Sequence, residues 1–152
     1  MKILILDSIT LGDDISLDKL KELGEVITYP QSSREEAKQR ITEHNPEVII
    51  TNKDVIDEAV LSGAPAVKMI AETATGYNNI DLAYAKAHGI TVANVAGYST
   101  QSVIQHTFAL CFYLLEKLSY YDNYVKSGAY INSPCFTHFD AKFHELAGKT
   151  WG

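Results

Sequence analysis

At 152 residues, the chain has the length of about one domain and can bury roughly two thirds of its unfolded surface. A net charge of −6 without any basic run predicts neither a nucleic-acid partner nor a membrane partner. The longest apolar stretch, residues 108–115, is far shorter than the roughly 20 residues that span a bilayer, and the first ten residues lack a signal-peptide pattern. We therefore expect a cytoplasmic protein without a metal site, in which Cys111 (buried in a helix) and Cys135 are reduced thiols.

Short apolar runs alternate with helical patterns over the first 95 residues. The runs typical of buried strands are 2–6, 25–29, 47–51, 66–71 and 90–95. The helical patterns between them are 16–23, 33–43, 54–61 and 79–88. Ser33 and Glu36 form a capping box, and Asp81 is expected mainly to start the fourth helix. This alternation predicts an α/β fold, and five short strands fit a flavodoxin-like parallel sheet of order 2-1-3-4-5.

The last third of the chain has a different character. A long helix is expected from a cap at Ser99 to about Lys126, and its apolar residues surround the axis. Such a helix is normally buried on all sides, so it should either dimerise or pack against a further domain. Residues 128–152 are rich in aromatic and turn residues and predict an extended arm. The expected organisation is thus a domain over 1–98, the helix over 99–127 and the arm over 128–152.

Ligands of open α/β sheets bind at the carboxyl ends of the strands, which directs attention to the loops there. A phosphoacceptor receiver domain is disfavoured, because Thr51 and Asn52 stand where the acceptor aspartate would be. A flavin-phosphate loop after the first strand is disfavoured as well, because Leu11 and two aspartates interrupt it. The motif GKT at 148–150 resembles the end of a P-loop, but Phe143 replaces the required first glycine.

The loop after the fourth strand, TATGYNNID, offers another possibility. Gly76 among small residues allows close approach of the backbone, and adjacent N–H groups at such a turn bind anions. A small carboxylate could bind there. The alternative is a tight turn without a ligand.

The segment TGYNNIDLAYAKAHGITVANVAGYSTQSVIQHTFALCFYLL, residues 75–115, resembles the D-isomer-specific 2-hydroxyacid dehydrogenases. TNK at 51–53 and the last twenty residues, 133–152, resemble the glycerate dehydrogenase/hydroxypyruvate reductase branch. The resemblance implies a flavodoxin-like substrate domain into which an NAD(P)-binding Rossmann domain is inserted. That Rossmann domain is absent from the chain, and residues 149–152 would be the opening of its first strand.

The resemblance also implies roles for individual residues. The N–H groups of Thr75 and Gly76 would hold the substrate carboxylate. Asn52 and Lys53 would face the same cleft, where Lys53 is either an electrostatic aid or an ordinary surface lysine. Thr107 matches a position that contacts the cofactor; otherwise its hydroxyl bonds back to a helix carbonyl.

The family's catalytic residues, an arginine and a histidine–glutamate pair, match positions beyond residue 152. Arg34 and Arg40 lie in a charged helix and match nothing catalytic, so no catalytic residue is assigned within the chain. We therefore expect part of an oxidoreductase that interconverts a small D-2-hydroxy acid and a 2-oxo acid, with NAD as cofactor and NADP as the alternative. The chain by itself is expected to be inactive, to bind no cofactor tightly and to form a homodimer through its long helix. The alternative is a non-catalytic flavodoxin-like interaction or self-association domain.

Overall fold

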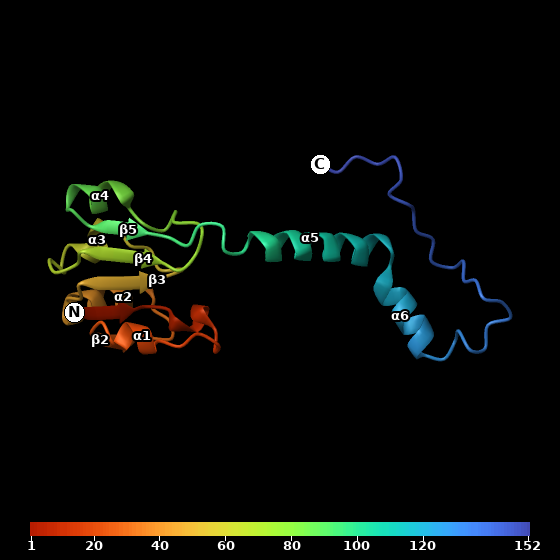
Figure 1. Ribbon diagram of the computed structural model, residues 1–152, viewed down its shortest axis with the longest axis horizontal. Coiled ribbons are helices and arrows are strands. Elements are labelled where there is room, and N and C mark those ends of the chain that lie inside the picture. Colours follow the sequence, from red (N-terminus) through yellow and green to blue (C-terminus); the bar gives the residue numbers. More distant parts are fainter. The chain divides into compact units, whose positions relative to one another are not determined.

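The computed structural model describes residues 1–152 and divides them into two compact units, Met1–Tyr98 and Ser99–Gly152. The elements of the first unit can be followed in Figure 1. In chain order they are β1 (Lys2–Ile5), η1 (Ser8–Leu11), α1 (Asp18–Lys21), β2 (Glu25–Thr28), α2 (Arg34–His44), β3 (Val48–Thr51), α3 (Glu58–Leu61), β4 (Met69–Glu72), α4 (Leu82–Ala87) and β5 (Thr91–Ala93).

The five strands form one parallel sheet of order β2-β1-β3-β4-β5, which confirms the predicted fold class. Ile5 pairs with Ile50 across β1 and β3, and Thr51 pairs with Glu72 across β3 and β4. Because neighbouring parallel strands end at the same edge, the loops that follow β1, β3 and β4 lie next to one another.

Apolar side chains from the strands build a core on each face of the sheet. One cluster joins the sheet to α2, α3 and α4, and its buried members are Leu4, Leu6, Ala37, Ile41, Ile49, Ile56, Val60, Leu61, Ala64, Val67, Ile70 and Ile80. The other cluster consists of Ile3, Ile5 and Ile50, and apolar residues of η1 and α1 pack against it. The burial of nearly all residues of β1 and β3 explains why their sequences are continuously apolar instead of alternating.

Side-chain caps define the starts of two helices. The capping box of Ser33 and Glu36 is present at α2, as predicted. Asp81 caps α4 by accepting a hydrogen bond from the N–H of Tyr84 at 2.9 Å. However, α4 begins at residue 82 and not at the predicted 79, because Ile80 forms a β-bridge with Ile56. The residues before Asp81 are therefore held in place by backbone pairing outside the helix.

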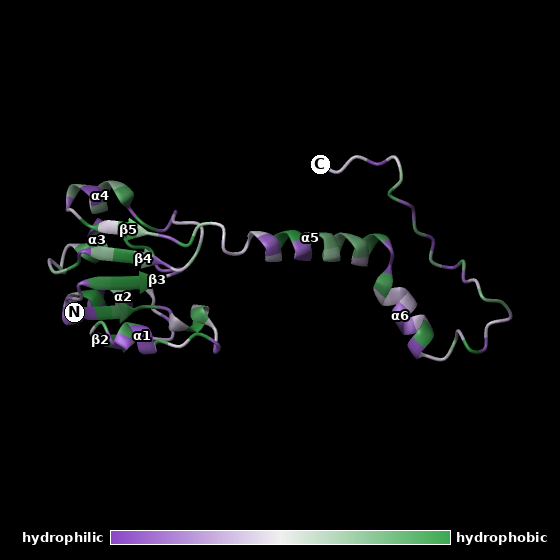
Figure 2. Cartoon of the chain, viewed as in Figure 1, coloured by the Kyte–Doolittle hydropathy of each residue, from purple (hydrophilic) through white to green (hydrophobic).

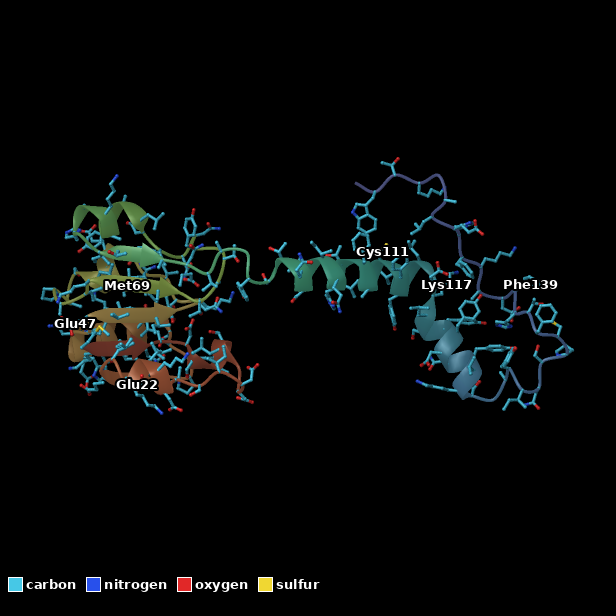
Figure 3. All side chains as sticks on the ribbon, in the orientation of Figure 1. Glu22, Glu47, Met69, Cys111, Lys117 and Phe139 are labelled. Atoms are coloured by element: carbon cyan, nitrogen blue, oxygen red, sulfur yellow. The ribbon has the colours of Figure 1, made fainter.

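The second unit contains α5 (Thr100–Leu115) and α6 (Leu118–Lys126), so the prediction of one continuous helix is wrong. Lys117, labelled in Figure 3 at the junction, adopts a left-handed conformation with φ 51° and ψ 42°. Its N–H donates to the carbonyl of Leu114, three residues back, which interrupts the regular α-helical ladder. At the start of α5, Ser99 makes no side-chain capping bond, contrary to expectation.

Most residues of α5 are apolar, and Figure 2 shows this helix green over most of its length after polar first turns. No residue of α5 is buried, and Leu114 is 72% exposed. Cys111 is half-buried on this helix, so its predicted full burial is wrong, and both Cys111 and Cys135 are free thiols. None of the helices combines the length and apolar character needed to cross a bilayer.

Residues 128–152 contain neither helix nor strand. Part of this arm folds onto α6, where the rings of Tyr124 and His138 stack with centroids 3.8 Å apart. The hydroxyl of Tyr121 donates to the carbonyl of Ala141, which is buried. Aromatic contacts with α6 therefore hold at least residues 138–141 of the arm.

Candidate functional site

Four polar side chains are buried in the first unit: Asp7, Thr51, Asp54 and Glu72. Asp7 follows β1, Thr51 and Asp54 lie at the end of β3, and Glu72 ends β4. All four therefore lie at the carboxyl edge of the sheet. Because buried polar groups cost free energy unless they are hydrogen-bonded, their partners determine how this edge is built.

Asp7 connects the end of β1 to the loop after β3. Its Oδ2 accepts hydrogen bonds from the backbone N–H groups of Asn52 at 2.8 Å and Lys53 at 2.7 Å. The hydroxyl of Thr51 lies 3.4 Å from the same oxygen. One carboxylate, that of Asp7, thus holds the loop that carries two of the predicted substrate-binding residues. Asp7 was not among the predicted site residues, although an aspartate directly after a buried strand is a usable signal.

Asp54 and Glu72 form the second half of the buried network. The Thr51 hydroxyl donates to Asp54 Oδ2 at 3.2 Å, and Asn79 Nδ2 donates to both the Asp54 carbonyl (3.0 Å) and Glu72 Oε2 (2.9 Å). Burial raises the pKa of Asp54, and the nearby Asp7 carboxylate raises it further. Burial also raises the pKa of Glu72; the bond from Asn79 partly opposes this rise, while Asp7 adds to it. The other oxygen of Glu72, Oε1, is buried without a partner, which further disfavours the ionised form.

This network predicts a specific pH dependence of stability. The pKa of Glu72 in the folded chain lies above its ordinary value of 4.5, so between the two values the folded chain binds more protons than the unfolded chain. Stability is then lost as the pH rises through that window. We expect the Glu72→Gln variant, which keeps an acceptor for Asn79, to lose less free energy of unfolding than the wild type as the pH rises above 4.5.

Urea titrations followed by circular dichroism measure this difference. Glu43→Gln makes the same charge change at an exposed position of α2 and is expected to keep the wild-type pH dependence. Identical pH profiles for Glu72→Gln and the wild type would show that burial of the Glu72 carboxyl does not cost stability.

The loop after β4 is held from the side of β5. The Thr75 hydroxyl donates to the carbonyl of Val95 at 3.1 Å, and Asn94 Nδ2 donates to the carbonyl of Thr75 at 2.7 Å. The N–H of Val95 donates to the carbonyl of Ala74 at 3.0 Å. In contrast, the N–H groups of Thr75 and Gly76 enter no backbone–backbone hydrogen bond, and both residues are exposed. Two adjacent donors on a fixed loop are therefore free to bind a ligand.

Neither the backbone conformation nor the packing within the chain requires glycine at position 76. Its φ is not in the left-handed region, so a side chain would not strain the backbone. A Cβ atom placed there would find no other atom within 4 Å, so packing does not exclude a side chain. The open space in front of Gly76 is the geometry needed for close approach of a ligand to the backbone.

Four of the five residues predicted to bind ligands lie on two adjoining loops of the sheet. Asn52 and Lys53 follow β3, while Thr75 and Gly76 follow the neighbouring β4. The two loops are joined by a hydrogen bond from the N–H of Thr73 to the carbonyl of Thr51 at 2.9 Å. Both loops therefore belong to one edge of the sheet.

An open hollow of about 370 Å³ lies at the same edge but on the side of β1 and β2. Lys53 lines it together with Asp7, Asp54 and Glu36, whereas neither Thr75 nor Gly76 does. Three acidic side chains against one lysine make this hollow unfavourable for a carboxylate. The free donors of the β4 loop are therefore the better candidate for an anionic ligand.

Thr107, the fifth predicted residue, belongs to α5 in the second unit. Its hydroxyl is exposed and donates to the carbonyl of Val103 at 2.7 Å. This is the helix hydroxyl geometry that sequence analysis gave as the alternative to cofactor contact. The chain contains no cluster of side chains suited to a metal ion.

An α/β unit with a parallel sheet of order 2-1-3-4-5 and free backbone donors at its carboxyl edge is typical of a small-ligand domain. Residues 3–143 match the family model for the D-isomer specific 2-hydroxyacid dehydrogenase catalytic domain. The chain belongs to this family.

Relatives and solved structures agree with this assignment. The chain is 32% identical to a hydroxypyruvate reductase of Blautia hydrogenotrophica, over all of its own length and 48% of that protein. It is 37% identical to a glycerate dehydrogenase of Methylorubrum extorquens, over 70% of the chain and 34% of that protein. A D-lactate dehydrogenase from Aquifex aeolicus, solved with NAD and lactic acid, is similar with a TM-score of 0.71 and 26% identity, over 96% of this chain and 41% of that one. The chain spans about half the length, or less, of the curated relatives it matches.

Proposed function

We propose that this chain is the substrate-binding part of an NAD(P)-dependent oxidoreductase that interconverts a small D-2-hydroxy acid and the corresponding 2-oxo acid. The observation that carries the proposal is the pair of N–H groups at Thr75 and Gly76 that make no backbone–backbone hydrogen bond, next to open space on the Cβ side of Gly76. The names of the relatives, hydroxypyruvate reductase and glycerate dehydrogenase, favour glycerate and hydroxypyruvate as the substrate pair.

The substrate carboxylate would accept hydrogen bonds from both N–H groups. Hydrogen bonds from a neutral N–H to a charged carboxylate are stronger than those to a neutral acceptor. Because hydrogen bonds with Val95 and Asn94 already fix the loop, little conformational entropy is lost when the ligand binds. Lys53, exposed on the neighbouring loop, would add electrostatic attraction for an anion. Asn52 lies on the same loop as Lys53 and would contact the substrate from that loop. Its Oδ1 is buried without a hydrogen-bond partner.

The cofactor of this family, NAD or NADP, supplies or accepts the hydride when it is bound. Within this chain, Thr107 is the residue proposed to contact it. The hydroxyl that donates to Val103 keeps its oxygen lone pairs, so it can still accept a hydrogen bond from a ligand. The proposed organisation assigns substrate binding to residues 1–98, interdomain and dimer contacts to 99–127, and the approach to the Rossmann domain to 128–152.

No residue of the chain is proposed as catalytic, so the chain alone should not turn over substrate. We expect no oxidation of NADH by the purified 152-residue chain with hydroxypyruvate or glyoxylate, and turnover when it is joined to a family Rossmann domain. Turnover by the chain alone would show that an acid–base residue within it has been overlooked. No turnover by the joined protein, with both parts folded, would count against the dehydrogenase function.

The exposed apolar surface of α5 favours a second candidate, a non-catalytic self-association domain. Contiguous apolar surface of this kind marks an interaction site more often than a free surface. We propose that α5 forms a homodimer contact, which is compatible with either function. Light scattering at micromolar concentration should give the mass of a dimer, whereas a mass near 16.8 kDa would exclude the contact. The NADH assay above separates the two candidate functions.

A further inference from the structure

We propose that Asp7 is a positioning residue that holds the Asn52–Lys53 loop in the conformation required for binding of the substrate anion. The inference rests on the proposed function, since it assigns a support to the loop that would face the substrate. Asp7 itself is 4% exposed and precedes the loop by 45 residues, so it acts through the backbone that it holds.

A single oxygen of Asp7 accepts both hydrogen bonds that hold the loop. Two consecutive backbone N–H groups, those of Asn52 and Lys53, converge on Asp7 Oδ2 at 2.8 and 2.7 Å. Consecutive N–H groups of an extended chain point in opposite directions, so their convergence requires a turn directly after β3. The carboxylate of Asp7 therefore specifies the local shape of the loop as well as its attachment to β1.

The fold does not require a charged side chain at position 7. It lies in a cluster with the buried carboxyls of Asp54 and Glu72, and it contributes to the raised pKa of both. A neutral acceptor at position 7 would avoid this repulsion. A charged acceptor binds N–H groups more strongly than a neutral one, so what the charge adds is a firmer hold on the loop.

The test compares two substitutions in the same network. Asp7→Asn keeps the size of the side chain but removes the charge from the atoms that hold the loop. Thr51→Val is the matched control, because the Thr51 hydroxyl contacts Asp7 and Asp54, including the N–H of Asp54, but not the N–H groups of Asn52 and Lys53. Circular dichroism establishes that each variant is folded, and Asp7→Ser, with a smaller side chain, replaces Asp7→Asn if the latter does not fold.

Two readouts by nuclear magnetic resonance are made on the 152-residue chain. We expect the amide hydrogens of Asn52 and Lys53 to exchange about ten times faster in Asp7→Asn than in the wild type, because their acceptor is weakened. We also expect the affinity for D-glycerate to fall roughly tenfold, which corresponds to about 1.4 kcal/mol. Thr51→Val should change neither quantity by a comparable factor.

Unchanged exchange at Asn52 and Lys53, or unchanged affinity despite faster exchange, would overturn the role of Asp7. Equal losses of affinity in Asp7→Asn and Thr51→Val would overturn it as well, because the effect would then be general destabilisation of the network. If the wild-type chain binds no D-glycerate, the assignment of substrate binding to this chain alone fails, and the positioning role toward substrate fails with it. The exchange rates would then still show whether Asp7 holds the loop.

Discussion

Replacement of Gly76 by valine is expected to abolish binding of D-glycerate while changing the stability of the chain by no more than about 0.5 kcal/mol. The side chain would enter open space, because no atom lies within 4 Å of a Cβ at this position and the backbone is not left-handed. That space is where a carboxylate would meet the N–H groups of Thr75 and Gly76. Loss of two charge-assisted hydrogen bonds, each about 1.5–3 kcal/mol, is enough to remove the binding of a small ligand.

Gly89→Val is the control, because it is expected to lower stability and to leave ligand binding unchanged. Gly89 has a φ of +68°, in the left-handed region, and a Cβ there would also meet no other atom. A valine at this position should therefore cost roughly 1–2 kcal/mol of stability through backbone strain while leaving ligand binding intact. Chemical denaturation and titration with D-glycerate measure both quantities for each variant. Normal binding by Gly76→Val would remove Gly76 from the proposed site.

Replacement of Ile49 by alanine is expected to lower the free energy of unfolding by about 2–5 kcal/mol. Ile49 is fully buried on the central strand β3, within the core cluster that joins the sheet to α2, α3 and α4. Truncation there removes apolar contacts and leaves a cavity that neighbouring strands cannot close. Because whole domains are stable by only about 5–15 kcal/mol, this single change would consume a large part of the total.

Ile9→Ala is the matched control for Ile49→Ala, since it makes the same chemical change in η1, where the side chain is 63% exposed. We expect it to change stability by less than about 0.5 kcal/mol. Urea denaturation of both variants under the same conditions makes the comparison. Similar effects at the two positions would mean that Ile49 is not part of a well-packed core.

The sheet, the start of α2 and the capping residue of α4 could be predicted because their signals are local. Continuous apolar runs mark the buried strands, and their alternation with helical patterns led to the order 2-1-3-4-5 that the structure shows. The capping box at Ser33 and Glu36 and the cap at Asp81 are likewise written in neighbouring residues. The early start predicted for α4 was wrong because the pairing of Ile80 with Ile56 joins residues 24 positions apart, beyond the reach of helical periodicity.

The break at Lys117 could not be predicted from periodicity. The residues around it include neither glycine nor proline, and the apolar pattern continues through the junction from Leu115 to Leu118. A left-handed lysine costs roughly 1–2 kcal/mol, so the local sequence does not favour a break at this position.

At the candidate site, the residues of the two loops could be predicted from the sequence, but the contacts that hold these loops could not. Asn52, Lys53, Thr75 and Gly76 come from the loops after β3 and β4, which the sheet order places side by side. The hydrogen bond from the N–H of Asn52 to Asp7 joins residues 45 positions apart, and the one from the Thr75 hydroxyl to Val95 joins residues 20 positions apart. Contacts of this separation emerge only when the strands are assembled, and no local pattern reports them.

The most direct test of the account is a titration of the ¹⁵N-labelled wild-type chain with D-glycerate, using glycerol, which lacks the carboxylate, as the control. We predict saturable shifts at the amides of Thr75 and Gly76, smaller shifts at Asn52 and Lys53, and no comparable response to glycerol. Shifts confined to other parts of the chain, or an equal response to glycerol, would contradict a carboxylate site at the loop after β4.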